Sequence, residues 1–175
     1  MSFNPDGSLD LMALLFERAK ELACLYQVQD ITADPDRTPD EVCRDLVEAI
    51  PPGWQHPDAC WAKITVDASV YEPPDRTETP WVLRAPIVVM GKPAGAIEVF
   101  YEEYFPKLDE GPFLKEERRL LDHVARRLGQ FLTERRLRGL GLLRVADVRQ
   151  APLALLVREF GSFGPRLQEL SPGED

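Results

Sequence analysis

Two long segments of the chain carry apolar residues at the three- and four-residue spacing of an amphipathic helix. The first runs from Leu9 to about Gln29, and its stripe comprises Leu11, Leu15, Ala19, Leu22 and Tyr26. The second follows Gly111-Pro112, and its stripe comprises Leu121, Val124, Leu128 and Phe131. Because proline suits the first turn of a helix, we expect the second helix to start close to Pro112. At roughly 25 residues it would be about 38 Å long, which is long for a small domain.

The segment between these helices predicts a shorter helix followed by a sheet. Thr38-Pro39-Asp40-Glu41 is typical of a capping box, so we expect a helix from Pro39 to about Ile50. Alternating apolar and polar residues predict strands at 60–66, 81–89 and 94–101, with a short strand at 69–72. Pro86 favours an edge position or a bulge for its strand, and residues 67–79 are expected to form a mobile loop. The pattern therefore predicts an α+β domain with a central antiparallel sheet flanked by helices, the long first and last helices packed together.

Glycines weaken the helical pattern after residue 138. Gly139 and Gly141 follow the second long helix, a short helix is expected to start at Pro152, and residues 161–175 resemble a frayed end. We therefore divide the chain into a domain over residues 1–138 and a partly helical C-terminal extension or linker over residues 139–175.

Composition and charge narrow the class of protein. Apolar residues make up 44% of the chain, enough for a core, and the net charge of −9 argues against nucleic-acid binding. The basic excess between Lys115 and Arg144 is interpreted as the solvated face of the long helix. We find no apolar run long enough for a membrane span and no signal peptide. Three cysteines without CxxC spacing fit a reducing cytoplasm, so we expect a cytoplasmic protein without a membrane partner.

No catalytic or metal-binding constellation stands out in the sequence. His56 and Cys60 flank a proline in a loop and do not supply the three or four ligands of a metal site. Cys24 and Cys43 fall on apolar helix stripes, where they are interpreted as small core residues. Phosphate-loop, HExxH and GxSxG motifs are absent. We therefore predict a protein that is not an enzyme and carries no cofactor and no metal.

Four stretches together resemble a known family. They are ELACLYQVQDI, LVEAIPPGWQHPDACWAKITV, GAIEVFYEE and DEGPFLKEERRLLDHVARRLG, and they cover about residues 17–138. In this order they resemble GAF-type sensory domains, of the subgroup found N-terminal in bacterial histidine kinases and related signalling proteins. The resemblance implies a GAF-like fold for residues 1–138 and a small-molecule pocket between the sheet and the loops that cover one of its faces.

The resemblance places the candidate ligand residues on the strands. They are Trp61, Lys63, Trp81, Arg84 and Glu98, in which the aromatic rings would supply contact area and the cations would hold an anionic group. The alternative is that Lys63, Arg84 and Glu98 pair with one another on a solvated face, since cross-strand ion pairs are ordinary. Trp54 and Trp81 would then simply cover the core.

The expected function is a non-catalytic sensory or regulatory domain of a bacterial signalling system. It would form a homodimer through its long helices, with Leu11, Leu15, Leu22, Leu121, Val124, Leu128 and Phe131 at the interface. A small-molecule ligand and a histidine kinase or other output domain are the further expected partners. Two alternatives stay open: a small-molecule enzyme on the same fold, for example a thiol-based reductase, and a ligand-free adaptor or dimerisation module.

Overall fold

The computed structural model describes residues 6–169, with side chains from residue 11 onward. Its centre is a four-stranded antiparallel sheet in the order β2-β1-β4-β3. The strands are β1 (Cys60–Val66), β2 (Ser69–Tyr71), β3 (Val82–Val89) and β4 (Lys92–Tyr101). The predicted α+β class with a central antiparallel sheet is therefore confirmed.

The strand boundaries follow the alternation of the sequence. Strand β1 coincides with the predicted segment, and β3 pairs only with β4, so Pro86 lies on an edge strand. Strand β4 begins two residues earlier than expected, because the turn before it uses only Met90 and Gly91, both with positive φ (52° and 76°). A register shift between Ile87 and Val88 accommodates Pro93 in this pairing.

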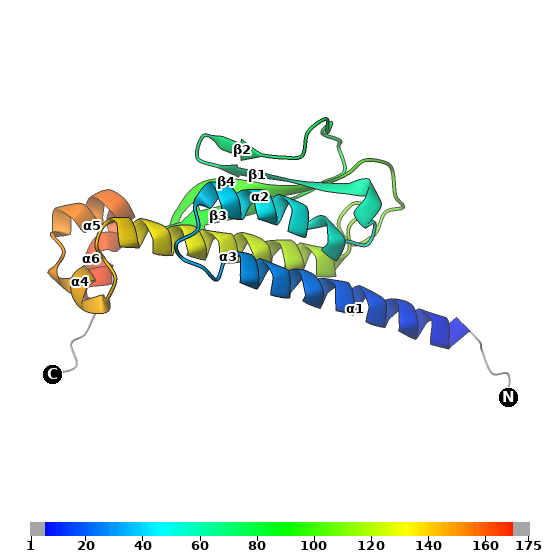
Figure 1. The fold of residues 1–175 in the computed structure, drawn as a ribbon, viewed down its shortest axis with the longest axis horizontal. Helices are drawn as coiled ribbons and strands as arrows, with labels where there is room; N and C mark the ends of the chain where they lie inside the picture. Colours follow the sequence, from blue (N-terminus) through cyan, green and yellow to red (C-terminus); the bar gives the residue numbers. More distant parts are fainter. Residues whose placement is uncertain (1–5, 170–175) are drawn as a thin grey trace.

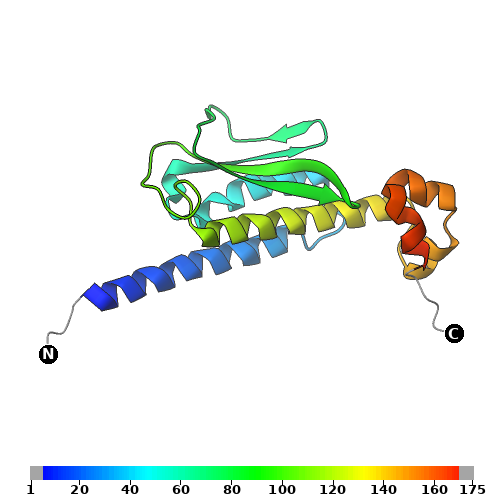
Figure 2. The ribbon, with the colours of Figure 1, turned by 180° about the vertical axis from the view of Figure 1, so that it is seen from behind.

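Helices cover one face of the sheet in two layers (Figures 1 and 2). Helix α2 (Pro39–Ala49) and helix α3 (Lys115–Gly139) lie directly on the sheet. Helix α1 (Asp6–Ile31) lies outside them, and only its C-terminal half runs beside α3. Its N-terminal half projects beyond the body of the protein. Short 3-10 turns at Pro51–Gly53 (η1) and Pro57–Ala59 (η2) connect α2 to β1.

The predicted capping box at the start of α2 is confirmed. Thr38 is the N-cap, and its hydroxyl accepts a hydrogen bond from the backbone N–H of Glu41 at 3.3 Å. The Glu41 carboxylate in turn accepts the backbone N–H of Thr38 at 2.8 Å. Two otherwise unpaired donors at the helix end are thus satisfied, which explains why the helix begins at Pro39.

Helix α3 begins at Lys115, three residues later than a start at Pro112. The carboxylate of Asp109 accepts the Lys115 N–H at 3.0 Å, and the carboxylate of Glu117 accepts the Leu114 N–H at 2.8 Å. These side chains satisfy donors at the helix N-terminus, where negative charge is also favoured by the helix dipole. Capping by acidic side chains, rather than the proline, therefore sets the start of this helix.

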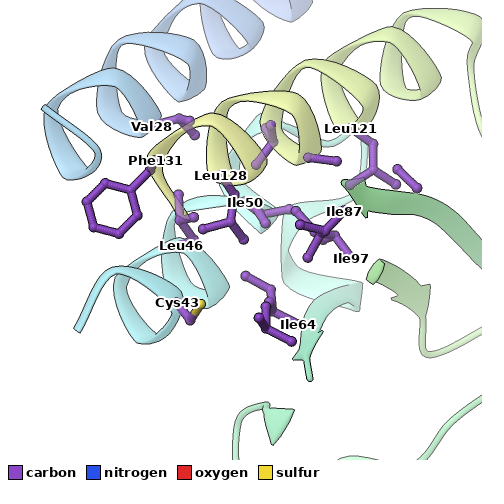
Figure 3. Close-up of a cluster of buried hydrophobic side chains, with 14 of the residues drawn as sticks. Val28, Cys43, Leu46, Ile50, Ile64, Ile87, Ile97, Leu121, Leu128 and Phe131 are labelled. Atoms are coloured by element: carbon purple, nitrogen blue, oxygen red, sulfur yellow. The ribbon is translucent and has the colours of Figure 1, made fainter. Parts of the chain in front are cut away.

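The apolar stripe of α3 forms the centre of the core. Figure 3 shows Leu121 beside Ile87 and Ile97 of the sheet, and Leu128 beside Leu46 and Ile50. Leu121, Val124 and Leu128 have no exposed surface, and Phe131 has 3%. The prediction that these four residues form a dimer interface is therefore wrong. Packing of a helix on a sheet and packing on another helix use the same spacing, so the sequence alone did not distinguish the two.

The C-terminal residues form a small group of helices at the far end of α3 (Figure 1). They are α4 (Val145–Gln150), α5 (Leu153–Phe160), the 3-10 turn η3 (Gly161–Phe163) and α6 (Gly164–Glu169). The expected frayed end is wrong for residues 161–169, because buried Leu156 and Phe160 give these helices an apolar contact. Gln168 also donates to the Ala151 carbonyl at 3.1 Å. Residues 170–175 lie outside the described part of the chain.

Close approach of α3 to β3 depends on Gly129. A Cβ atom at this position would lie 2.4 Å from the carbonyl oxygen of Val88, so we expect Gly129→Ala to force the helix and strand apart. The overpacking should lower the free energy of unfolding by about 1–3 kcal/mol despite the better helix propensity of alanine. Urea denaturation measures the change.

Gly139→Ala is the matched control, since no atom lies within 4 Å of the added Cβ at this position of the same helix. It should leave the protein as stable as the wild type or stabilise it by up to about 1 kcal/mol. A Gly129→Ala variant that gains stability to the same extent would contradict the close packing.

Candidate functional site

Four of the five predicted ligand residues lie on the sheet face opposite the helices, namely Trp61, Lys63, Arg84 and Glu98, whereas Trp81 lies on the side of the core. Trp61 is 1% exposed and stacks on Phe100 of the neighbouring strand, with ring centroids 4.4 Å apart. Trp81 is half-buried and packs against the core, with an edge contact to Tyr104. The Trp61 Nε1–H is buried without a hydrogen-bond partner among the described residues. The aromatic residues here therefore contact protein rather than open space.

The charged members of this set already have partners. The Lys63 ammonium donates to the Glu78 carboxylate in the loop between β2 and β3, and this hydrogen bond raises the pKa of Lys63. Arg84 and Glu98 form a cross-strand ion pair with 3.8 Å between nitrogen and oxygen. The Thr79 hydroxyl donates to the Tyr101 carbonyl at 2.7 Å, so the loop expected to be mobile is attached to the sheet at both Glu78 and Thr79. A two-part groove between α1 and α3 and a cavity beside the C-terminal helices are described below. None of the five predicted ligand residues lines either of them.

A buried polar cluster joins the start of α3 to the sheet. Glu117 is 3% exposed, and its carboxylate accepts hydrogen bonds of 2.8 Å from the Gln55 N–H, the Leu114 N–H and the Tyr101 hydroxyl. Burial raises the pKa of Glu117, although these three hydrogen bonds oppose the shift. His56 stacks on Phe105 nearby, with ring centroids 3.8 Å apart. Because both oxygens of the carboxylate accept hydrogen bonds from the protein itself, we assign this cluster a structural role.

The three cysteines lie in the core and are poor nucleophiles. Burial raises the pKa values of the Cys24 and Cys43 thiols to about 12. The pKa of Cys60 is raised further, by burial and then by the charges of Glu117 and Glu102. Since the thiolate is the reactive form, this arrangement disfavours thiol chemistry at neutral pH. Within residues 6–169, no three His, Cys, Asp or Glu side chains gather in a way that could hold a metal ion.

Helix α1 carries a run of exposed apolar residues. The consecutive residues 11–16 are Leu-Met-Ala-Leu-Leu-Phe, and all six are exposed. Successive helix positions turn by about 100°, so this run is apolar around the whole helix. Leu11, Leu15 and Leu22, which were predicted at a dimer interface, are 54–56% exposed and available to a partner. A helix that is apolar all round is normally buried on all sides.

The C-terminal half of α1 is attached to the body. Cys24, Val28 and Ile31 are buried against the rest of the protein. The Lys20 ammonium donates to the Trp54 carbonyl at 2.8 Å, and Arg127 of α3 donates to the Thr32 hydroxyl at 2.8 Å. The direction of α1 is therefore fixed by its second half, and its first half is held out in solvent.

A groove runs along the junction of α1 and α3. One part, of about 490 Å³, includes Leu22, Leu25, Tyr26 and His123. A second part, of about 230 Å³, lies nearer the start of α3, and Leu25 and His123 line both parts. The groove floor is apolar, and its rims carry charges of both signs, Arg18 and Glu21 on α1 with Glu116 and Arg119 on α3. This shape suits a second helix lying between the two.

The sequence of helix α1 also carries a second 3,4 pattern, which shares Ala19 and Tyr26 with the leucine stripe. Alongside the predicted leucines, the exposed residues Met12, Phe16, Ala19, Ala23 and Tyr26 are spaced by four, three, four and three residues. This is the heptad seam of a helix that packs against another helix. This 3,4 spacing could have predicted the exposed seam from the sequence. The predicted interface instead used the leucines of the neighbouring stripe.

Comparisons with known proteins give no independent identification. No protein-family model, no curated protein and no solved structure matches the chain. In the part of the chain described here, no helix combines the length and apolar character required to cross a bilayer. The functional reading therefore depends on the residues and the geometry given above.

The raised pKa of the buried Glu117 carboxyl predicts how the stability of the protein depends on pH. The protonated form of Glu117 is favoured in the folded protein, so its contribution to stability is present at low pH and is lost as pH rises through the raised pKa. We expect the free energy of unfolding of the wild type to fall, relative to that of Glu117→Gln, as pH increases from about 4.5. Urea denaturation over a pH series measures the difference.

Glu116→Gln removes a neighbouring carboxylate that is outside the hydrogen-bonded cluster, and so controls for the change in net charge. A wild type that gains stability relative to Glu117→Gln over this pH range would show that the hydrogen bonds outweigh burial, contrary to the account.

Proposed function

We propose that the protein is a non-catalytic regulatory module that dimerises through α1, with the α1–α3 groove receiving α1 of a second copy. The observation that carries this proposal is the exposed apolar run at residues 11–16 on a helix that projects from the body. The groove continues the same surface along α1 and α3. Two helices from each copy would then form a four-helix contact.

The energetics favour such a contact. Seven large apolar side chains of α1 are at least half exposed: Leu11, Met12, Leu14, Leu15, Phe16, Leu22 and Tyr26. Covering each would contribute on the order of 1 kcal/mol, since complete burial of such a side chain contributes about 1.5–3 kcal/mol. In a symmetric dimer, the same apolar side chains would be covered on both copies. This gain is comparable to the roughly 4–15 kcal/mol cost of association, so we expect a dimer that dissociates on dilution.

The charges on the groove rims fit a symmetric interface. Arg18 and Glu21 pair with each other at 3.0 Å within α1, while Glu116 and Arg119 stand on the facing edge of α3. A two-fold contact brings the same surface from each copy together, so a surface with both signs can complement itself. The alternating charges would set the relative position of the helices, while the apolar seam supplies most of the affinity.

The position of α3 supports a sensory role. It joins the proposed interface on one side, the sheet on the other and the C-terminal helices at its end, so a change in any of these would be transmitted along one rigid rod. The antiparallel sheet with α2 and α3 on one face and α1 outside them supports the resemblance to GAF-type sensory domains. On that resemblance, a histidine kinase or another output domain stays the expected partner.

The non-catalytic part of the proposal is supported by the cysteines and by the absence of a catalytic motif. All three thiols are buried with raised pKa values. The cluster at Glu117 uses its hydrogen-bonding capacity within the protein. No observation favours the thiol-based reductase considered from the sequence.

Oligomeric state tests the proposed interface directly. Leu15→Glu with Leu22→Glu places two charges on the exposed seam and should yield a folded monomer, because neither side chain contributes to the core. Light scattering coupled to size-exclusion chromatography measures the mass, and circular dichroism verifies the fold. The wild type should be a dimer at high micromolar concentration.

Val70→Glu is the matched control, since Val70 is equally exposed but lies on β2, away from α1. It should leave the dimer intact. A wild type that stays monomeric at high concentration, or a double variant that stays dimeric, would refute the proposed interface.

The same substitutions on α3 should behave differently. Val124→Glu with Leu128→Glu introduces two charges into sites without solvent exposure, so we expect unfolding rather than a folded monomer. Loss of the thermal transition measured by circular dichroism would confirm this. A folded, monomeric α3 variant would mean that this stripe faces a second copy after all.

A further inference from the structure

An apolar cavity lies between the body of the protein and its C-terminal helices. Its walls come from β3 and the turn between β3 and β4, from α3, and from the C-terminal segments α4, α5, η3 and α6. The apolar side chains that line it include Val88, Met90, Leu137, Val148, Phe160 and Phe163. Lys92 attaches the two sides, because its ammonium donates to the Arg158 carbonyl at 3.3 Å. The cavity is therefore bounded by segments that are far apart in the sequence.

Its size is that of a small-molecule site. The cavity has a volume of about 460 Å³, within the usual range of about 300–1,000 Å³ for ligand pockets. A single turn of an α-helix, about 5.4 Å long and 10 Å wide, would occupy roughly 420 Å³. A partner helix could thus insert only one turn, whereas a small molecule could fill the cavity. The exposed Phe163 and Val88 at the mouth, 45% and 47% exposed, mark apolar surface that a ligand would cover.

The polar groups around this cavity are satisfied, with one exception. Thr133 donates to the Gly129 carbonyl at 2.8 Å and accepts the Met90 N–H at 3.0 Å. Gln130 donates to the Glu134 carboxylate at 3.0 Å. Arg126 also lines the cavity, and among the described residues its guanidinium has no ion pair or hydrogen bond. The cavity therefore has a mainly apolar interior with two charged residues in its lining, the unpaired Arg126 and Glu134, whose carboxylate is held by Gln130.

We propose that this cavity binds a small amphiphilic carboxylate, with the apolar part against Leu137, Phe160 and Phe163 and the carboxylate on Arg126. The guanidinium matches a carboxylate in shape and charge, and can donate two parallel hydrogen bonds to it. An apolar interior in which Arg126 is the one charged lining residue without a partner among the described residues disfavours both a neutral polar ligand and a multiply charged one.

Such a ligand would link α3 to the C-terminal helices. It would cover apolar surface on both sides of the cavity, and so hold α4, α5 and η3 against the end of α3. The ligand's regulatory role rests on the proposed function, but its binding does not require dimerisation, because no residue of the cavity lies on α1.

Binding of decanoate tests the site, with decan-1-ol as the uncharged analogue of the same length. We expect decanoate to shift the methyl NMR signals of Val88, Leu137 and Val148, and decan-1-ol to bind about tenfold more weakly. Arg126→Gln should weaken decanoate binding about tenfold and leave decan-1-ol binding unchanged. Val88→Trp should narrow the cavity mouth and weaken both compounds.

Each variant has a matched control. Arg119→Gln removes an exposed arginine two turns earlier on α3, and Val70→Trp enlarges an exposed valine on the other edge strand; both should bind decanoate like the wild type. Folding of each variant is verified from its NMR spectrum. Repeating the titration with Leu15→Glu/Leu22→Glu separates the two proposals, since a monomeric variant should retain decanoate binding.

Several results would overturn the site. They are absence of decanoate binding, equal binding of decan-1-ol, shifts confined to the α1–α3 groove, and an Arg126→Gln variant that binds decanoate as the wild type does. Any of these would leave the dimer proposal unaffected, because that proposal is judged on the mass of the protein.

Discussion

Packing of α3 against the sheet is the constraint on which the rest of the structure depends. Gly129 brings the helix so close to β3 that its missing Cβ would meet the Val88 carbonyl oxygen. At that separation Leu121 reaches the strand side chains Ile87 and Ile97. Leu121, Val124 and Leu128 all lose their exposure. One face of α3 is thus committed to its own sheet, and whatever else the helix does uses its flanks and its two ends.

The two ends of α3 have different chemistry. At the first, Glu117 gathers three hydrogen bonds from the loop before β1, from β4 and from the helix start, which joins three segments at one buried carboxylate. At the second, the helix passes beyond the sheet and the C-terminal helices fold back onto it, leaving an apolar cavity with Arg126 at its edge. A buried polar junction held by three hydrogen bonds is expected to be rigid. The apolar junction at the second end is incompletely filled, so it can respond to a ligand.

Sequence patterns predicted those features that depend on local chemistry. Strand β1, the capping box at Thr38 and the burial of Cys24 and Cys43 all follow from periodicity or from turn residues. Local patterns do not show which surface an apolar helix stripe packs against. Leu121 to Phe131 have the spacing of a dimer seam but pack on a sheet, while the seam of Met12 and Phe16 on α1 is the one left exposed.

The candidate sites were harder to predict from the sequence than the fold. Trp61, Lys63 and Arg84 share a sheet face as expected, but Lys63 pairs with Glu78 from a loop, which no strand pattern could indicate. Glu117 resembled an ordinary surface charge in the first turn of a helix, and only tertiary contacts bury it. The cavity beside Arg126 is formed by residues from 88 to 167, so it exists only once the C-terminal helices have packed.

Hydrogen exchange measured at two protein concentrations tests the central claim, that a second copy covers the apolar surface of α1. Amides of residues 11–22 should be protected at high concentration and exchange faster on dilution, while those of residues 120–132 in α3 should exchange at the same slow rate in both samples. Exchange in α1 that is independent of concentration would contradict the account.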